Sequence, residues 1–265
     1  MVILSVVSAK GGVGKTTLVA NLAQSIAKER NVFALDLDPQ NALRLHFASG
    51  SREHDGVARA ELGHRPWGSC IRQTQKPFVL PFGAVNDDEA EKFEKRLQDY
   101  PDRLMAELHA LPLQASDLVI VDTPVGSSAL LKSALRVSNY VLVVLQSDPA
   151  SYATLPLIQE RVRRHCAGHA NFRGVIYLIN NVFSGSKLSR DLMSVLRTQL
   201  KDDLIQDVIH KDESVNEALA FEKSVLEYAP GCEATADLLK VSVRLEKKLF
   251  PYVSDRARPV KIDSP

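Results

Sequence analysis

Short apolar runs alternate with longer stretches of helical periodicity along most of the chain. Several runs are rich in β-branched residues and apolar on both faces, which is typical of strands buried in a parallel sheet. The expected strands are Val2–Val7, Val32–Leu35, Phe78–Leu80, Leu118–Val121, Tyr140–Leu145, Val175–Ile179 and Leu204–Ile209. The expected helices are Thr16–Arg30, Asp87–Ala110, Ser127–Arg136, Leu155–Cys166, Lys187–Leu200 and Glu233–Phe250. This alternation predicts a doubly wound α/β fold, with a mostly parallel sheet, helices on both faces and a ligand crevice at the carboxyl ends of the strands.

The pattern extends over residues 1–250, which we expect to form a single domain. Its least regular part is 48–76, which is rich in Gly, His, Arg and Ser and is interpreted as an irregular insertion after the second strand. Residues 251–265 contain three prolines and few apolar residues, so a flexible tail is expected there.

Composition narrows the class of protein. The chain has 265 residues, of which 45% are hydrophobic, and a net charge of +1, which excludes a strongly basic nucleic-acid coat. The cysteines, Cys70, Cys166 and Cys232, are too far apart for a zinc motif and do not suggest a disulfide framework. No apolar run reaches the length of a transmembrane helix. A cytoplasmic protein is therefore predicted.

The strongest chemical signal follows the first expected strand and opens the first expected helix. It is the segment Lys10-Gly11-Gly12-Val13-Gly14-Lys15-Thr16-Thr17. Glycines let the backbone turn several N–H groups toward one anion, and the helix N-terminus adds partial positive charge. Lys15 can then reach the β- and γ-phosphates, and the Thr16 hydroxyl can bind Mg²⁺. The match to G-x-x-x-x-G-K-[ST] is incomplete, because Ala9 stands at the first glycine position.

Two other interpretations of this segment stay open. One is a glycine-rich turn that binds nothing, and the other is a dinucleotide-binding turn, since Gly12 and Gly14 are followed by Asp36 at a suitable distance. A dinucleotide site would not need the lysine after Gly14, whereas a triphosphate site does.

The segment resembles the deviant Walker A loop of the MinD/ParA family of dimerising ATPases. Three further segments are similar to motifs of that family: Asp36–Asn41, Leu118–Pro124 and Ile209–Ala218. Within the family, the chain looks most like the BcsQ branch, which is associated with bacterial cellulose synthesis. The segments that suggest this branch are Asn41–Phe47, Val57–Ala60 with Trp67, Leu80–Gly83 and Ser151–Pro156.

The resemblance implies that ATP and Mg²⁺ bind at the carboxyl ends of the strands. Lys15 would hold the β- and γ-phosphates, Thr16 would bind Mg²⁺, and Thr17 would lie near the α-phosphate. Lys10 would be the signature lysine that crosses to the nucleotide of a partner subunit, so ATP would drive formation of a homodimer. A cationic group supplied in this way raises the rate by about 10³–10⁵ in GTPases.

Carboxylates at the strand ends are candidates for the remaining chemistry. Asp38, beside Pro39, is placed to position the attacking water, or is simply a turn-forming residue. Asp122 ends an apolar strand, where an unpaired carboxylate is costly, so a Mg²⁺-bound water is its natural partner. Asp36 either supports Mg²⁺ through water or caps the loop that follows.

The base pocket is expected on the far side of the phosphate loop. Asn180 ends an expected strand and by resemblance reads the adenine edge, with Asn181 as its competitor. The segment that contains His210 and Asp212 is similar to the loop that closes this pocket.

Three functions compete for such a switch. In the first it is a slow ATPase that binds other proteins of the cellulose synthesis machinery, which would recruit it to the inner membrane or the cell pole. In the second it partitions DNA, but the basic residues of 161–165 and 244–248 have acidic neighbours, so DNA binding is not expected. In the third it docks on the membrane, but the chain after Pro251 lacks an apolar face, so any membrane contact is expected to be weak or indirect.

Overall fold

A computed structural model describes residues 1–47, 54–73 and 77–251 of the chain. In this part, one sheet has the strand order β3-β4-β2-β5-β1-β6-β7. The strands are β1 (Val2–Val7), β2 (Val32–Asp36), β3 (Arg72–Gln73), β4 (Phe78–Leu80), β5 (Leu118–Asp122), β6 (Tyr140–Gln146) and β7 (Gly174–Asn180). All neighbouring pairs are parallel except β3 with β4, so the predicted mostly parallel sheet is confirmed.

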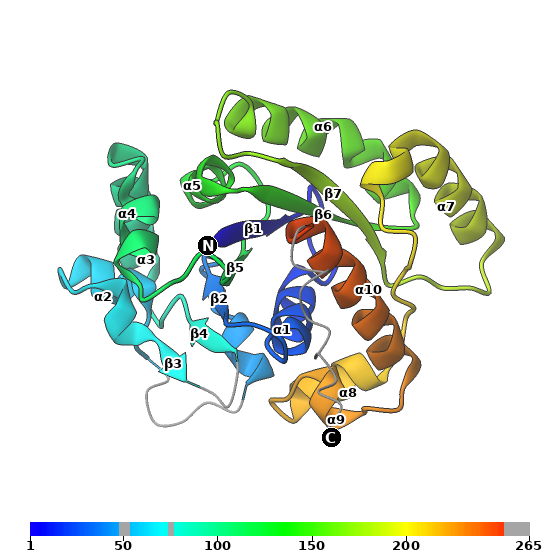
Figure 1. Cartoon of the computed structure of the whole chain (residues 1–265), viewed down its shortest axis with the longest axis horizontal. Helices are drawn as coiled ribbons and strands as arrows, with labels where there is room; N and C mark the ends of the chain where they lie inside the picture. Colours follow the sequence, from blue (N-terminus) through cyan, green and yellow to red (C-terminus); the bar gives the residue numbers. More distant parts are fainter. Residues whose placement is uncertain (48–53, 74–76, 252–265) are drawn as a thin grey trace, which may run out of the picture.

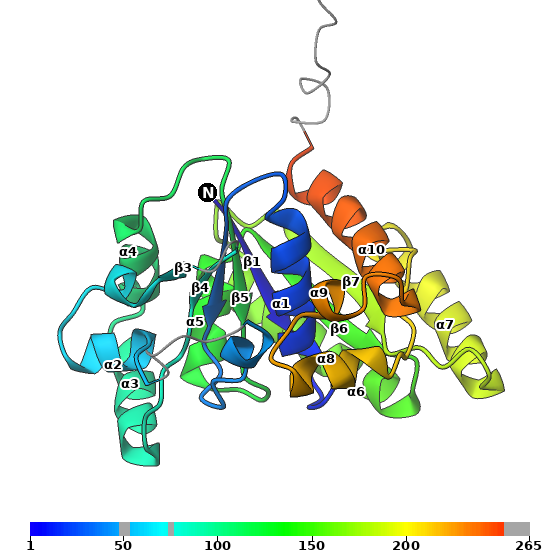
Figure 2. The ribbon, with the colours of Figure 1, turned by 90° about the horizontal axis from the view of Figure 1, so that it is seen from below.

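Helices cover both faces of this sheet (Figures 1 and 2). They are α1 (Lys15–Ile26), α2 (Val57–Leu62), α3 (Asp87–Asp99), α4 (Arg103–Ala110), α5 (Ala129–Val137), α6 (Pro149–Cys166), α7 (Lys187–Leu200), α8 (Ser214–Ala220), α9 (Val225–Tyr228) and α10 (Glu233–Leu249). Short 3-10 turns are η1 (Leu43–His46), η2 (Trp67–Cys70) and η3 (Lys201–Asp203).

Strand alternation divides the core between the two faces. Leu4 and Val6 of β1 pack with α1 and α10, whereas Ile3 points to the other face and packs with α3, α4 and α5. Since successive side chains of a strand point to opposite faces, a sheet with apolar residues at consecutive positions must be covered twice. The covering helices therefore hold all six parallel strands in the interior.

Two predicted elements are wrong. The expected strand Leu204–Ile209 is an extended segment that meets β7 only locally, where the N–H groups of Ile205 and Ile209 donate to Tyr177 O and Ile179 O at 2.9 and 3.1 Å. Polar residues interrupt the ladder, and Asp207 turns out to accept from Arg244 Nε at 3.1 Å.

The expected helix Asp87–Ala110 is two helices, α3 and α4. The break falls at Tyr100, whose φ of −122° and ψ of 77° leave the helical region. The ring of Pro101 disfavours a helical conformation at the residue that precedes it. The apolar periodicity on both sides of the break had concealed it.

The segment expected to be irregular contains α2, η2 and β3 within residues 54–73. Trp67 is only 1% exposed, and its Nε1 donates to the fully buried Glu61 at 2.9 Å. Arg96 and Arg103, from α3 and α4, hold the same carboxylate at 2.6 and 3.0 Å. The irregular character predicted for this part is therefore corrected, because a buried polar network fastens it to two helices. The rest of 48–76 and the predicted tail after Pro251 lie outside the described residues.

Candidate functional site

The glycine-rich loop lies between β1 and α1, at the carboxyl edge of the sheet. Gly12 and Gly14 have φ angles of +72° and +89°, in the left-handed region that favours glycine. A Cβ on Gly14 would lie 2.6 Å from Nδ2 of Asn180, so the loop also needs glycine for this close approach. Helix α1 begins directly after it, at Lys15, with its first N–H groups available to an anion.

Lys15 has an unusual environment for a lysine. Its side chain is only 7% exposed. Burial lowers the pKa of this ammonium, while the nearby carboxylates of Asp122 and Asp38 act in the opposite direction. A buried cation at the start of a helix is well placed to neutralise phosphate oxygens.

Two buried carboxylates lie side by side at the strand ends. Asp36 of β2 and Asp122 of β5 are partners in the strand register, and each is 0% exposed. Burial raises the pKa of Asp36 well above its ordinary value, and the neighbouring Asp122 raises it further. Burial raises the pKa of Asp122 to about 7, although the Thr16 hydroxyl and Lys15 act to lower it.

The two carboxylates differ in their partners. Asp36 Oδ1 and Oδ2 accept the backbone N–H groups of Asp38 and Leu43 at 2.9 and 3.2 Å, so this side chain caps the loop after β2. Both oxygens of Asp122 are buried and accept no hydrogen bond of proper geometry, even though the Thr16 hydroxyl lies nearby. Such oxygens fit a hydrated Mg²⁺ ion, which prefers oxygen ligands and keeps several waters.

Asp38 lies at the open side of these groups and is half-buried. Its Oδ1 accepts the N–H of Gln40 at 3.0 Å, as in an Asx turn. Asp38 is therefore a turn-forming residue in this structure. Its negative charge also acts to raise the pKa of Lys15.

Lys10 contacts residues at the end of β6 and the start of α6. Its Nζ contacts Asp148 Oδ2 at 2.7 Å and Gln146 Oε1 at 3.1 Å. Asp148 also caps α6, because its Oδ1 accepts the N–H of Ser151 at 2.7 Å. Burial acts to raise the pKa of Asp148, but Lys10 and the capping bonds lower it. Asp148 and Gln146 were not predicted from the sequence, where the local signal was a capping aspartate before Pro149.

The residues expected around the base are engaged in contacts of their own. Asn180 Nδ2 donates to Val13 O at 2.8 Å and so joins β7 to the phosphate loop. Asn181 has a φ of +56° and lines a cavity of about 430 Å³ together with Gln146 and Asp148.

His210 and Asp212 lie in the loop before α8. His210 Nδ1 lies 2.7 Å from Asp237 of α10, and Glu233 is 3.5 Å away. These three form a possible ligand set that the sequence analysis did not find, although Glu233 and Asp237 share a helix face. Asp212 accepts the N–H groups of Ser214 and Ala234 at 3.0 and 3.1 Å, and the bond from Ala234 contributes most to lowering its pKa.

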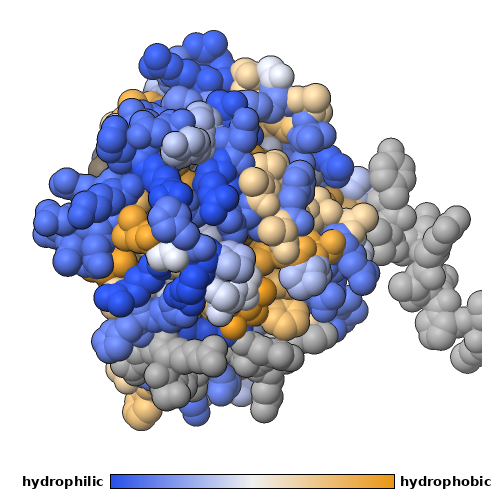
Figure 3. All heavy atoms as spheres, turned by 90° about the vertical axis from the view of Figure 1, so that its left-hand side faces the viewer, coloured by the Kyte–Doolittle hydropathy of each residue, from blue (hydrophilic) through white to orange (hydrophobic). Residues whose placement is uncertain are grey.

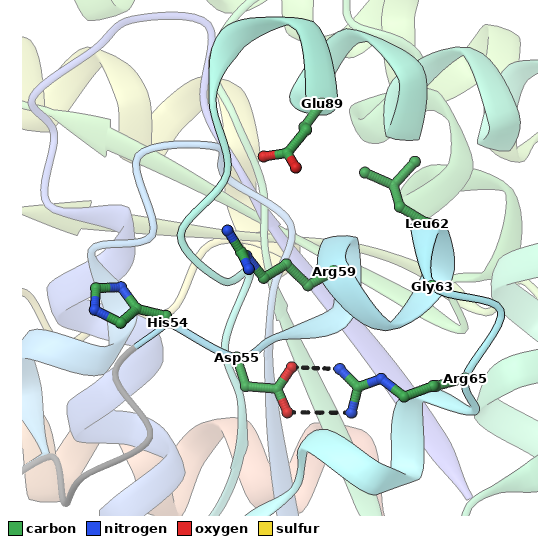
Figure 4. A pocket seen from close by; sticks show the side chains of 7 residues that line it. All are labelled: His54, Asp55, Arg59, Leu62, Gly63, Arg65 and Glu89. Atoms are coloured by element: carbon green, nitrogen blue, oxygen red, sulfur yellow. Dashed lines mark hydrogen bonds and ion pairs between the residues drawn. The ribbon is translucent and has the colours of Figure 1, made fainter.

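A cavity of about 500 Å³ lies elsewhere, between α2 and the start of α3 (Figure 4). Arg65 pairs there with Asp55 at 2.5 Å, and Arg59 Nε donates to Ala84 O at 2.6 Å. This side of the molecule is mostly hydrophilic, with smaller hydrophobic areas between the hydrophilic ones (Figure 3). In this cavity Arg65 and Asp55 are thus paired with each other, and Arg59 is bonded to the backbone.

A phosphate loop with two lysines, at the carboxyl edge of a parallel sheet, defines a P-loop ATPase of the MinD/ParA class. The structure of the septum site-determining protein MinD from Pyrococcus horikoshii, complexed with Mg-ADP, has the same fold. The two match with a TM-score of 0.75 over 93% of this chain and 96% of that one, at 21% identity.

The family model for the cellulose biosynthesis protein BcsQ matches residues 1–244, so the chain belongs to the BcsQ family. The BcsQ protein of Salmonella typhi is 29% identical over 246 residues, which cover 91% of this chain and 93% of that protein. The chromosome partitioning protein ParA of Myxococcus xanthus is 26% identical over 243 residues, covering 88% and 84%. None of the helices in the described ranges combines the length and apolarity that crossing a membrane requires.

Proposed function

We propose that this protein is an ATP-hydrolysing, dimerising switch that serves bacterial cellulose synthesis. The observation that carries the nucleotide part is the pair of unpartnered, buried oxygens of Asp122 beside Lys15 and Thr16. Leaving a buried carboxylate without a partner costs stability, and a cation held for function removes that cost. Membership of the BcsQ family supports the cellulose part.

Each part of the loop has its own task in this proposal. The backbone N–H groups of Gly11, Gly12, Val13 and Gly14 face the phosphates, with Lys15 on the β- and γ-phosphates and Thr17 near the α-phosphate. Thr16 and Asp122 hold Mg²⁺ directly or through water, and Asp36 joins only through water because both its oxygens already accept backbone N–H groups. The bound metal ion would neutralise charge on the transferring phosphoryl group.

Two charged residues at the open side of the site, Asp38 and Lys10, serve ATP hydrolysis and dimerisation in this proposal. Asp38 positions the attacking water, since a carboxylate at the mouth of the site can accept its proton or orient it. Lys10 leaves Asp148 and Gln146 and reaches the nucleotide of the second subunit. The homodimer then forms because each subunit neutralises the phosphates of the other.

Asn180 offers its amide to the adenine ring from the end of β7. His210 and Asp212 shape the same side of the pocket from the loop before α8. A switch is expected to hydrolyse ATP slowly. The functional result of ATP binding is therefore the dimer and not the release of a product.

Partner choice separates the cellulose function from DNA partitioning and from membrane docking. Two of the basic residues that would serve DNA binding are engaged with acids: Arg163 makes two bonds of 2.8 Å to Glu160, and Arg244 lies 3.1 Å from Asp207. Paired cations gain little by neutralising phosphates. These contacts favour protein partners in the cellulose synthesis machinery.

An Asp38→Ala variant, locked with ATP and Mg²⁺, tests the proposal by affinity capture from cells that make cellulose. We expect it to retain ATP and to retain cellulose synthesis proteins, while Lys15→Ala, the control that cannot hold nucleotide, retains neither. Recovery of DNA or lipid in place of those proteins would contradict the cellulose function. Failure of the wild type to bind ATP would contradict the nucleotide part.

A further inference from the structure

A groove that the nucleotide site does not use runs along helix α5. It lies between the end of α3 on one side and the end of α6 on the other, and α5 is seen between these two helices in Figure 1. We call it the α5–α6 groove. Its volume is about 280 Å³, and it is lined by five basic side chains: Lys132, Arg136, Arg164, His165 and His169.

These charges converge because of helix geometry. Lys132 and Arg136 stand four residues apart and therefore share one face of α5. Arg164 and His165 come from the last turn of α6, and His169 follows it. Burial lowers the pKa of His165, and the charges of Lys132 and Arg164 lower it further, which shows that both cations act on the same point.

The groove has little negative charge of its own. No acidic side chain lines it within the described part of the chain. Among the basic side chains of the groove, and counting partners in the described ranges, only Arg136 has an ion pair. It lies 3.3 Å from Asp102, whose side chain is 90% exposed, and such a pair is worth little. Two carboxylates of the neighbouring helices are engaged elsewhere: Glu94 accepts the N–H of Ala129 at 2.5 Å, and Glu160, which also acts on Arg164, binds Arg163.

The rest of the lining is apolar or uncharged. Leu97, Pro101 and Ala129 give the groove apolar walls. Ser133 is only 5% exposed, and it adds a hydroxyl to the lining. Cations that have at most one weak ion pair among them, a hydroxyl and apolar walls together suit a ligand that carries both carboxylates and apolar groups.

We propose that the α5–α6 groove binds a short acidic segment of a protein partner, in which carboxylate and apolar side chains alternate. Arginine and lysine recognise carboxylates by charge-assisted hydrogen bonds. The volume lies near the lower limit of ligand pockets, about 300 Å³, so it accepts a few side chains. A DNA duplex needs cations spread along its phosphates, whereas these converge on one hollow.

A labelled peptide in which glutamate and leucine alternate tests this by fluorescence polarisation, with a glutamine version as its neutral control. We expect the acidic peptide to bind at least about tenfold more tightly than the neutral one, and added salt to weaken it. Lys132→Glu and Arg164→Glu should each lower this affinity by about tenfold, which is about 1.4 kcal/mol. Lys247→Glu, an exposed lysine on α10 with the same charge change, is the matched control.

Three outcomes would overturn the proposal: equal binding of both peptides, an equal loss in Lys247→Glu, or displacement of the peptide by inorganic phosphate or duplex DNA at similar concentrations. The experiment uses no nucleotide, and Lys132 and Arg164 lie outside the proposed catalytic machinery. Turnover of ATP should therefore be unchanged in both variants. A failure of the groove and a failure of the proposed ATPase are thus observed separately.

Discussion

At the scale of single residues, the site gathers charges that a folded protein normally keeps in water. Lys15, Asp36 and Asp122 are all buried at the carboxyl edge of the sheet. Burial opposes the charged form of each, which is why the pKa of Lys15 is lowered and the pKa values of the two carboxyls are raised. Perturbed groups that meet in one place are typical of functional sites.

Replacing Lys15 by alanine should abolish ATP binding, because the loop loses the one buried cation that faces the phosphates. Removing a partner from a buried charge contact typically costs about 3–5 kcal/mol, which corresponds to more than a hundredfold in affinity. Titration calorimetry with ATP and Mg²⁺ measures the change. The control is Lys28→Ala, which removes an exposed lysine just beyond the end of α1. Unchanged affinity in Lys15→Ala would contradict the phosphate role.

A histidine outside the site predicts a pH effect on stability. His46 is 3% exposed, and burial lowers its pKa to about 4. Because the unfolded chain binds a proton near pH 6.5 and the folded chain does not, stability is fully present above about pH 6.5 and is lost as the pH falls toward 4. The loss is on the order of 3 kcal/mol.

Urea unfolding at several pH values measures this effect. His46→Leu should flatten the dependence over this range, while His109→Leu, which removes an exposed histidine on α4, should leave it unchanged. An equal slope in wild type and His46→Leu would show that other groups cause the acid sensitivity.

At the scale of elements, the features that could be predicted from the sequence are those determined by residues adjacent in the chain. The loop from Lys10 to Thr17 is contiguous, so its glycines and lysines indicate an anion site before any fold is known. The contacts of Lys10 with Asp148 and Gln146 could not be predicted, because they join residues that only the packing of β6 and α6 brings together. The contacts of Trp67 and of the arginines with Glu61 could not be predicted for the same reason, since this network is tertiary.

Asp148 caps α6 and also pairs with Lys10, so a change at this residue should affect dimerisation. Asp148→Asn keeps an oxygen for the Ser151 N–H, so α6 should still begin at Pro149, but it removes the charge that holds Lys10. The lost ion pair is partly exposed and worth at most about 1 kcal/mol, so the dimer should form at ATP concentrations lower by up to about fivefold.

Analytical ultracentrifugation across an ATP series measures this shift. Asp102→Asn makes the same charge change at an exposed site and serves as the control. A dimer of Asp148→Asn that needs as much ATP as wild type would mean that the contact with Lys10 does not restrain it.

At the scale of the whole molecule, the register of the sheet explains how distant segments share one site. Parallel pairing of β2, β5 and β1 places their carboxyl ends on one edge, so that the loop, Asp36 and Asp122 meet there. The parallel direction of the strands follows from buried apolar runs joined by helices. Their exact neighbours do not, because the apolar runs of β2, β5 and β6 are interchangeable by composition and only packing selects among them.

The last prediction concerns assembly. In wild type, ATP and Mg²⁺ should produce a homodimer whose interface buries at least about 1,000 Å², as a stable interface requires. Lys10→Ala should still bind ATP, because Lys15 and the loop N–H groups remain, but it should stay a monomer, since no cation crosses to the partner's phosphates. Light scattering after size exclusion distinguishes the two states, with Lys28→Ala as the control that dimerises normally. A dimer of Lys10→Ala at the wild-type ATP concentration would contradict the crossing lysine, because the phosphates of each subunit would then be neutralised by its own loop alone.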